Sequence, residues 1–263
     1  MKSLRESLLD DDLVGKTDEM IKDEIKSFLK ENYNCKGSIK ISRKTNADGK
    51  YEVSSVRDVE VKNRNINSLT NRAFIWTTVN GSFEVLYCNS LKSLDGAPKE
   101  VGGNFYCSSC RSLKSLEGAP KEVGGNFNCS DCACLESLEG APEKVGKDFN
   151  CMYCNSLKTL EGAPQMINGG FHSYNCNSLI SLEGAPKEVG RSFECGYCNS
   201  LTSLEGAPEK VGWNFSCTNC QSLKTLKGAP KEVGGFFYCY GCASKFTIED
   251  VKKITNVKKG IVR

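Results

Sequence analysis

The tripeptide Gly-Ala-Pro recurs seven times at a constant spacing, and this regularity constrains the fold more than any other feature. Its glycines are 22 residues apart: Gly96, Gly118, Gly140, Gly162, Gly184, Gly206 and Gly228. The surrounding pattern is F-x-C-x-x-C-x-S-L-x-S-L-E-G-A-P-K-E-V-G-G-x, with seven apolar positions per unit. These positions are too few and too unevenly spaced for helices, which the glycines also disfavour. Each unit is therefore expected to form one coil of a solenoid.

Stacking is what would make such coils stable. A unit of 22 residues cannot bury its apolar edge alone, whereas stacked units bury a continuous core with neighbouring strands about 4.8 Å apart. We expect seven or eight coils in a rod roughly 35 to 40 Å long. The 25 glycines and 16 cysteines among 263 residues follow from this periodicity. The predicted fold class is mainly β, an open solenoid with an α/β N-terminal cap and a short C-terminal helical cap.

The chain divides into four predicted segments. Residues 1–16 form a flexible tail, residues 17–58 a helix plus β-hairpin cap, residues 59–246 the solenoid and residues 247–263 the C-terminal cap. Open solenoid ends expose core and strand edges, so atypical end segments are expected. In the tail, Leu4 and Leu8 precede a run of aspartates, and such short amphipathic starts resemble tags that sort proteins into the heads of large tailed phages.

The N-terminal cap shows both helical and strand periodicity. Ile21, Ile25, Phe28 and Leu29 share one helical face, with Thr17 as N-cap. Segments 38–42 and 51–56 alternate around Asn46-Ala47-Asp48-Gly49 and predict a hairpin.

A degenerate coil is then expected over residues 59–80, with Val61 aligned on Phe83 and Val79 on Val101. At the other end, Thr247 is expected to cap a short helix that carries Ile248, Val251 and Ile254 and closes the rod.

The stretch Phe-x-Cys-x-x-Cys-x-x-Leu-x-x-Leu resembles a leucine-rich repeat. The pattern C-x-x-L-x-x-L-x-x-A-P-x-x-V-G-G is similar to the BspA-like subclass of bacterial surface repeats, and also to anonymous phage and bacterial proteins with SLEGAPKEVGG repeats. The resemblance covers about residues 83–245 and implies a leucine-rich-repeat-type solenoid. For function it implies a binding surface, because such proteins bind unrelated partners. BspA-like proteins are usually exported, and the absence of an export signal here disfavours a cell-surface adhesin.

Charge is balanced, with 35 basic and 32 acidic residues and a net charge of +3. Lys-Glu pairs that swap order between units, such as Lys121-Glu122 and Glu143-Lys144, interrupt any basic stripe. We therefore expect neither a nucleic-acid nor a membrane partner. The acidic start and the lack of an 18-residue apolar run predict a cytoplasmic protein, with incorporation into a virion as an open possibility.

The cysteines have two interpretations. Cys107, Cys110, Cys129 and Cys132 have the C-x2-C-x18-C-x2-C spacing of a zinc ribbon, but a repeat that contains C-x-x-C generates this spacing automatically. The first cysteine is Val85 in one unit and Ser173 in another, as a small core position tolerates and a zinc ligand does not. A structural cysteine ladder with no metal and no cofactor is the favoured prediction, and a metal-binding or redox ladder is the alternative.

Little in the sequence supports catalysis. His172 is the single histidine, so a His-based triad has no second member, and the glycines lie in repeated turns instead of one phosphate loop. We predict no enzymatic activity.

The variable positions beside the predicted strand are rich in aromatic residues, which are enriched at interface hot spots. The predicted partner-binding residues are Tyr106, Tyr153, His172, Tyr174, Tyr197, Trp213, Tyr238 and Tyr240. The leading hypothesis is a protein-binding or structural scaffold, in its most specific form phage-encoded or virion-associated. A carbohydrate-binding module that uses the same tyrosines is a further alternative.

Overall fold

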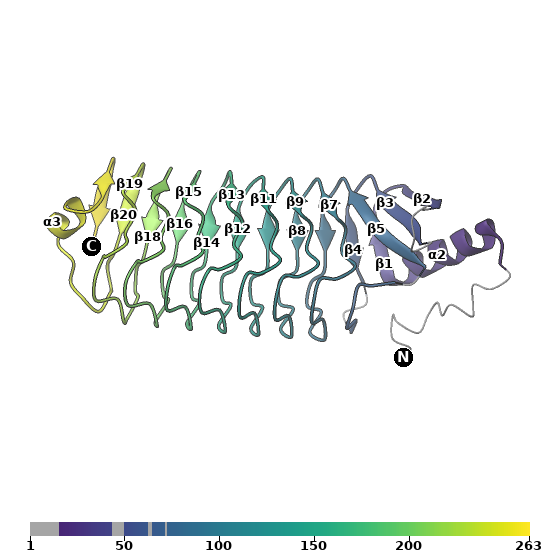
Figure 1. The fold of residues 1–263 in the computed structure, drawn as a ribbon, viewed down its shortest axis with the longest axis horizontal. Helices are drawn as coiled ribbons and strands as arrows, with labels where there is room; N and C mark the ends of the chain where they lie inside the picture. Colours follow the sequence, from purple (N-terminus) through teal and green to yellow (C-terminus); the bar gives the residue numbers. More distant parts are fainter. Residues whose placement is uncertain (1–15, 44–49, 63–64, 72) are drawn as a thin grey trace.

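A computed structural model describes residues 16–43, 50–62, 65–71 and 73–263. They form an elongated parallel β-solenoid of about 10 turns, with a helix at each end (Figure 1). The mainly β solenoid predicted from the repeat is confirmed. The predicted tail lies almost wholly outside the described residues, as does the hairpin turn at 46–49.

Each repeat contributes two short strands on opposite sides of the coil. In the coil of residues 105–126, these are β8 (Phe105–Tyr106) and β9 (Glu122–Val123). Phe105 and Val123 are buried, whereas Tyr106 and Glu122 point outward, because successive side chains on a strand alternate between faces. Equivalent residues of successive coils pair in parallel, so the same side chain recurs along the rod.

The first strands form one continuous eleven-stranded sheet. In spatial order its members are β1 (Tyr33–Cys35), β4 (Val59–Val61), β6 (Phe83–Glu84), β8, β10 (Phe127–Asn128), β12 (Phe149–Asn150), β14 (Phe171–His172), β16 (Phe193–Glu194), β18 (Phe215–Ser216), β20 (Phe236–Tyr238) and β22 (Gly260–Val262).

The second strands form two sheets, one of seven strands and one of four. The seven are β13 (Met166–Ile167), β11 (Lys144–Val145), β9, β7 (Glu100–Val101), β5 (Phe74–Val79), β3 (Tyr51–Ser55) and β2 (Ile39–Arg43). The four are β15 (Glu188–Val189), β17 (Lys210–Val211), β19 (Glu232–Val233) and β21 (Asn256–Val257).

A column of phenylalanine rings runs through the core. The rings of Phe105 and Phe127 stack with centroids 5.3 Å apart and planes 5° apart, and Phe127 stacks on Phe149 in the same way. This geometry follows from the parallel register, because each ring lies one strand spacing from its copy. At the N-terminal end, Trp76 meets Phe83 edge-on and closes the column.

The Gly-Ala-Pro turn needs its glycine. Gly118 has φ +85°, in the left-handed region that glycine adopts without strain. A Cβ there would also collide with the backbone of Leu94 and Asp95 in the preceding coil. The close stacking of coils at this corner therefore explains why the glycine recurs in every unit.

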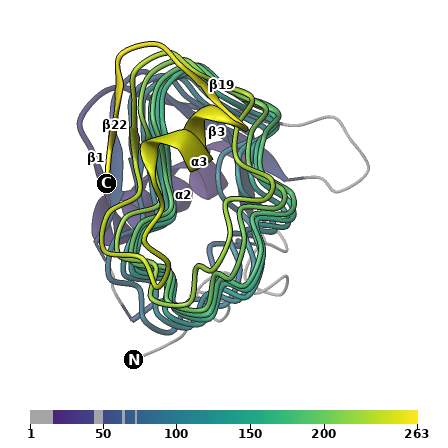
Figure 2. The same ribbon diagram turned by 90° about the vertical axis from the view of Figure 1, so that its left-hand side faces the viewer.

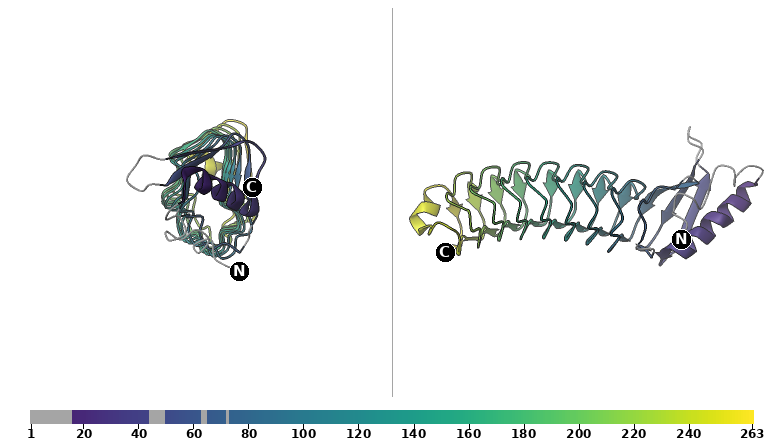
Figure 3. Two further views of the ribbon diagram at one scale, coloured as in Figure 1. Left: turned by 90° about the vertical axis from the view of Figure 1, so that its right-hand side faces the viewer. Right: turned by 90° about the horizontal axis from the view of Figure 1, so that it is seen from below.

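The N-terminal cap contains the predicted helix and hairpin. Helix α2 (Asp18–Asn32) begins after Thr17, whose side chain accepts a hydrogen bond from the Met20 backbone N–H, and it buries Ile25 and Phe28. Strands β2 and β3 pair antiparallel. In Figure 3, α2 crosses the outline of the coils at this end.

The predicted register of the degenerate coil is wrong by two residues on one side. Val59, not Val61, pairs with Phe83, whereas Val79 pairs with Val101 as predicted. Val59 and Val61 are both buried, as Phe83 and Val85 are in the next coil. Val59 precedes Phe83 by 24 residues, so this first coil contains two residues more than a regular one, and a fixed shift of 22 misplaces its first strand.

The C-terminal cap is more extensive than predicted. Helix α3 (Ile248–Lys252) has the expected N-cap at Thr247 and buries Val251, but Ile254 lies beyond the helix and is 43% exposed. Figure 2 shows α3 across the end of the coils. After it, β21 and β22 continue both sides of the solenoid, so the helix does not end the rod. The coil that begins with β4 and the turn that ends in β22 explain why the rod has about 10 turns and not seven or eight, whereas β1 runs antiparallel to β4.

Candidate functional site

Three tyrosines from successive coils touch one another at the outward corner that follows the first strand. The rings of Tyr153 and Tyr174 have centroids 6.1 Å apart in an edge arrangement, and those of Tyr174 and Tyr197 lie 4.8 Å apart. Tyr153 is 41% exposed and Tyr197 is 40% exposed. We call Tyr153, Tyr174 and Tyr197 the aromatic ridge.

Two members of the ridge occupy an unfavourable backbone conformation. Counting the core phenylalanine as position 1 of each coil, Tyr153 and Tyr197 are at position 5, with φ of +61° and +57°. Other coils place Asn175, Asn219 or Gly241 there, which tolerate this conformation. A left-handed backbone costs a bulky residue roughly 1–2 kcal/mol. Tyr87, Ser109 and Asp131 also take this conformation, so it is a feature of the repeat, and Tyr153 and Tyr197 place a bulky side chain where asparagine or glycine would fit with less strain.

Tyr174 lies at position 4, and its ring leans over the next coil. There Gly196 occupies position 4, and a Cβ on it would be 3.5 Å from Cδ2 of Tyr174. Desolvation raises the pKa of Tyr174, and the hydrogen bond with Tyr197 adds to this effect. The ring of Tyr174 therefore lies close to the Gly196 backbone, and it contacts the ring of Tyr197 in the same coil.

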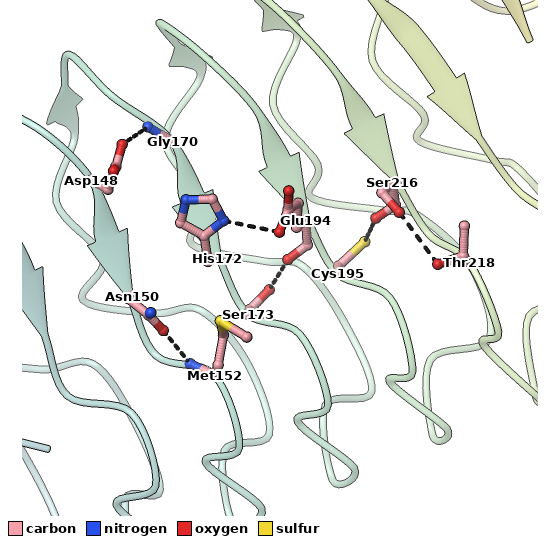
Figure 4. Close-up of polar contacts among 10 residues, drawn as sticks. All are labelled: Asp148, Asn150, Met152, Gly170, His172, Ser173, Glu194, Cys195, Ser216 and Thr218. Carbon is pink, nitrogen blue, oxygen red and sulfur yellow. Dashed lines mark hydrogen bonds and ion pairs between the residues drawn. The ribbon is translucent and has the colours of Figure 1, made fainter.

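His172 lies beside the ridge at position 2, on β14. Its Nδ1 is 3.0 Å from Oε2 of Glu194, and this bond lowers the pKa of the Glu194 carboxyl (Figure 4). The ring occupies space left by Gly170, since a Cβ there would be 2.7 Å from Nε2 of His172. Asp148 Oδ1 accepts a hydrogen bond from the Gly170 backbone N–H at 2.8 Å. These contacts place a charged, hydrogen-bonded rim next to the ridge.

The other predicted residues are distributed along the rod. Tyr106 is half-buried on β8, two coils before Tyr153. Tyr238 contacts Phe236 with ring centroids 5.9 Å apart, and Tyr240 is 45% exposed. Trp213 is 51% exposed in the turn that leads into β18, whereas the ridge follows the strands. The structure therefore brings together three of the eight predicted residues as one ring cluster, with His172 beside them.

Sequence reasoning missed Tyr87. It is 52% exposed and has φ +59°, because it occupies the same position 5 as Tyr153 and Tyr197. Reading position 5 as one column of the repeat would have found it.

From Cys110 onward, the second cysteine of each coil has a specific backbone partner in the preceding coil. Its Sγ donates to the carbonyl of the position 3 residue in the preceding coil, at 3.2 Å for Cys132 to Cys107 and 3.3 Å for Cys154 to Cys129. The same bond is made by Cys110, Cys176, Cys198, Cys220 and Cys242. Cysteine suits this position because it is small and apolar and still supplies a weak donor.

Burial keeps most of these thiols protonated. It raises the pKa of Cys129 and of Cys220 to about 12, whereas a thiol must lose its proton to bind a metal. Within the part of the chain that the structure describes, no three His, Cys, Asp or Glu side chains are grouped to hold a metal ion. Two thiols differ: a hydrogen bond with the Cys88 side chain lowers the pKa of Cys110, and one with the Cys217 side chain lowers that of half-buried Cys242 to about 7.

No family model, curated protein or solved structure matches this chain. The likeness to leucine-rich repeats therefore remains a resemblance of sequence pattern. Among the described residues, no helix has the length and apolar character needed to cross a membrane.

Proposed function

We propose that this protein is a non-enzymatic scaffold that binds another protein through the aromatic ridge. The observation that carries the proposal is the contact between Tyr153, Tyr174 and Tyr197 on three successive coils, with Tyr153 and Tyr197 exposed and Tyr174 half-buried between them. Tyrosine is enriched among interface hot spots because it combines a large apolar ring with a hydroxyl.

The frame beneath the ridge favours binding. Each tyrosine follows a strand whose phenylalanine is fully buried, and the rings already pack against one another. Side chains held in place before binding lose little conformational entropy on association. The rim formed by His172 and Glu194 supplies polar groups around this apolar centre, as in many protein interfaces.

The test replaces each ridge residue with one that the repeat already uses at the same position. In the triple variant Tyr153→Asn, Tyr174→Ser and Tyr197→Asn, the new residues are ones that other coils carry at the same positions, so folding should be retained. We expect the immobilised wild-type chain to capture a defined protein from its native source, and the triple variant to lose at least tenfold in affinity for that purified partner.

The matched control is Tyr87→Asn, which makes the same change at position 5 outside the ridge. It should bind the partner like the wild type. Equal binding by the triple variant would refute the proposal. Binding to a glycan array that is lost in the triple variant, without any protein capture, would replace it with the carbohydrate-binding alternative.

A further inference from the structure

The last coils depart from the repeat at two positions, and both become lysine. The residue after the second leucine is acidic in six coils and is Lys227 in the seventh; the six are Asp95, Glu117, Glu139, Glu161, Glu183 and Glu205. The first leucine of the coil, present from Leu91 to Leu223, is replaced in the final unit by Lys245. The repeat is thus an internal reference that makes these two changes stand out.

Both lysines line one cavity of about 580 Å³ at the C-terminal end of the rod. Lys224 and Lys253 contribute two further ammonium groups, while Leu226, Phe246 and Ile254 form an apolar wall. Asp250 of α3 also lines the cavity, and α3 is the helix at the end of the rod that Figure 2 shows. At the same place in earlier coils, the repeat has an acidic residue and a buried leucine.

The cavity carries a net positive charge, with four lysines against Asp250 and the Glu205 partner of Lys227. Lys227 pairs with Glu205 at 2.7 Å, and the Asp250 carboxylate accepts hydrogen bonds from the backbone and side chain of Thr247, which lower its pKa together with the nearby charge of Lys253. Within the described residues, Lys224, Lys245 and Lys253 form no ion pair, and all three are exposed. An anionic ligand would relieve their mutual repulsion and gain charge-assisted hydrogen bonds.

Protection of a sheet edge does not account for these lysines. Charged residues on edge strands are a common device against edge-to-edge pairing. Lys227 and Lys245 lie instead in the loops of the last coils, outside the edge strands β21 and β22. A bound ligand is the alternative explanation. A ligand that fits both the ammonium groups and the apolar wall would carry acidic groups flanked by apolar ones.

Residues 7–14 of this chain have that pattern, Ser-Leu-Leu-Asp-Asp-Asp-Leu-Val. They cannot reach the cavity of their own molecule. About 10 turns at about 4.8 Å each separate the two ends by roughly 50 Å, while the six residues from Lys16 back to Asp10 span at most about 21 Å. We propose that the cavity binds an acidic, partly apolar peptide segment, and that its occupant is residues 7–14 of a second copy, which joins copies head to tail.

The binding test uses a labelled synthetic peptide of residues 7–14 with the full-length chain. Its anisotropy should saturate, the affinity should fall as salt rises, and a peptide with three Asp→Asn changes should bind at least tenfold more weakly. Lys224→Glu with Lys253→Glu should also lose at least tenfold in affinity. The control Lys114→Glu changes the same repeat position as Lys224 in a distant coil and should have no effect.

The assembly test is sedimentation velocity of the full chain. Association should rise with concentration and disappear when Asp10, Asp11 and Asp12 become Lys, or when Lys224 and Lys253 become Glu. Mixing these two charge-reversed chains should restore association, because the tail of each variant is then opposite in charge to the cavity of the other. Failure of the peptide to bind, or equal binding of its Asn version, would overturn the site. Peptide binding with a chain that stays monomeric at every concentration would overturn the second copy as occupant.

Discussion

The inside and the outside of each coil follow opposite rules. In the coil of residues 149–170, Phe149, Cys154 and Leu157 are fully buried and are the same in neighbouring coils, whereas Asn150 and Tyr153 on the outside vary. Each inner side chain packs against its own copy, so a change disturbs two neighbours. Outer side chains have no such constraint. Stability should therefore depend on the inside, and recognition on the outside.

Alkaline pH should have the largest effect, because it acts on the buried thiols together. Burial raises the pKa of Cys129 and Cys220 from 9.0 to about 12, so folding favours the protonated thiol. Their stabilising contribution is complete below pH 9 and is lost as pH rises from 9 towards 12, at about 1.4 kcal/mol per pH unit for each thiol. Urea unfolding of reduced protein between pH 7 and 11 measures this loss.

The matched variant is Cys129→Val, which copies Val85 at the same repeat position. It should make the unfolding free energy fall less steeply with pH, by the contribution of one thiol. An unfolding free energy that stays constant from pH 8 to pH 10.5 would contradict the importance of the thiols.

Truncation in the phenylalanine column should be the most damaging single substitution. Phe149 lies 5.3 Å from Phe127 and 5.2 Å from Phe171 between ring centroids, so Phe149→Ala leaves a cavity between two rings. We expect it to lower the unfolding free energy by about 3–5 kcal/mol. The exposed Lys158→Ala in the same coil should change it by no more than about 0.5 kcal/mol. Similar losses for both would break the distinction between inside and outside.

The two cysteines of one coil should differ in their tolerance of valine. Cys154→Val removes the donor to the Cys129 carbonyl and should cost about 1–3 kcal/mol. Cys151→Val should cost less than about 1 kcal/mol, because Val85 occupies this position naturally. Thermal and urea unfolding of the two variants would sharpen the comparison within the core itself, and the reverse ranking would contradict the assigned role of the thiol.

The smallest effect is expected on the outside, with the opposite sign. Tyr153→Asn relieves a left-handed backbone at φ +61° and should raise the unfolding free energy by up to about 1 kcal/mol. Tyr87→Asn, at φ +59°, should do the same. A destabilisation of either variant would mean that tyrosine contributes to folding at this corner.

Periodic features could be predicted from the sequence, and features without a repeat could not. The coil, its buried Phe, Cys and Leu columns, and the caps at Thr17 and Thr247 all follow from spacing and capping chemistry. Strands β1, β21 and β22 lack the repeat signature, and they form because the neighbouring coils offer edges to pair with. Tertiary context, not local propensity, determines those strands.

The candidate site could be predicted only in part for a similar reason. Exposure of Tyr153 and Tyr197 follows from their place beside the strand. The contact between Tyr174 and Tyr197 joins positions 4 and 5 of adjacent coils, and the spacing within one repeat does not reveal it. The left-handed backbone at position 5 could not be predicted either, because tyrosine, serine and aspartate occur at that position as well as asparagine.

The most direct test of the division between inside and outside measures both partner affinity and melting temperature for one outer variant and one inner variant. We predict that Tyr153→Asn with Tyr197→Asn loses partner binding while its melting temperature stays level or rises. Cys154→Val should melt at a lower temperature and still bind the partner normally while folded. If instead the tyrosine variant melts early with its binding intact, or the cysteine variant loses binding while fully folded, the account is wrong.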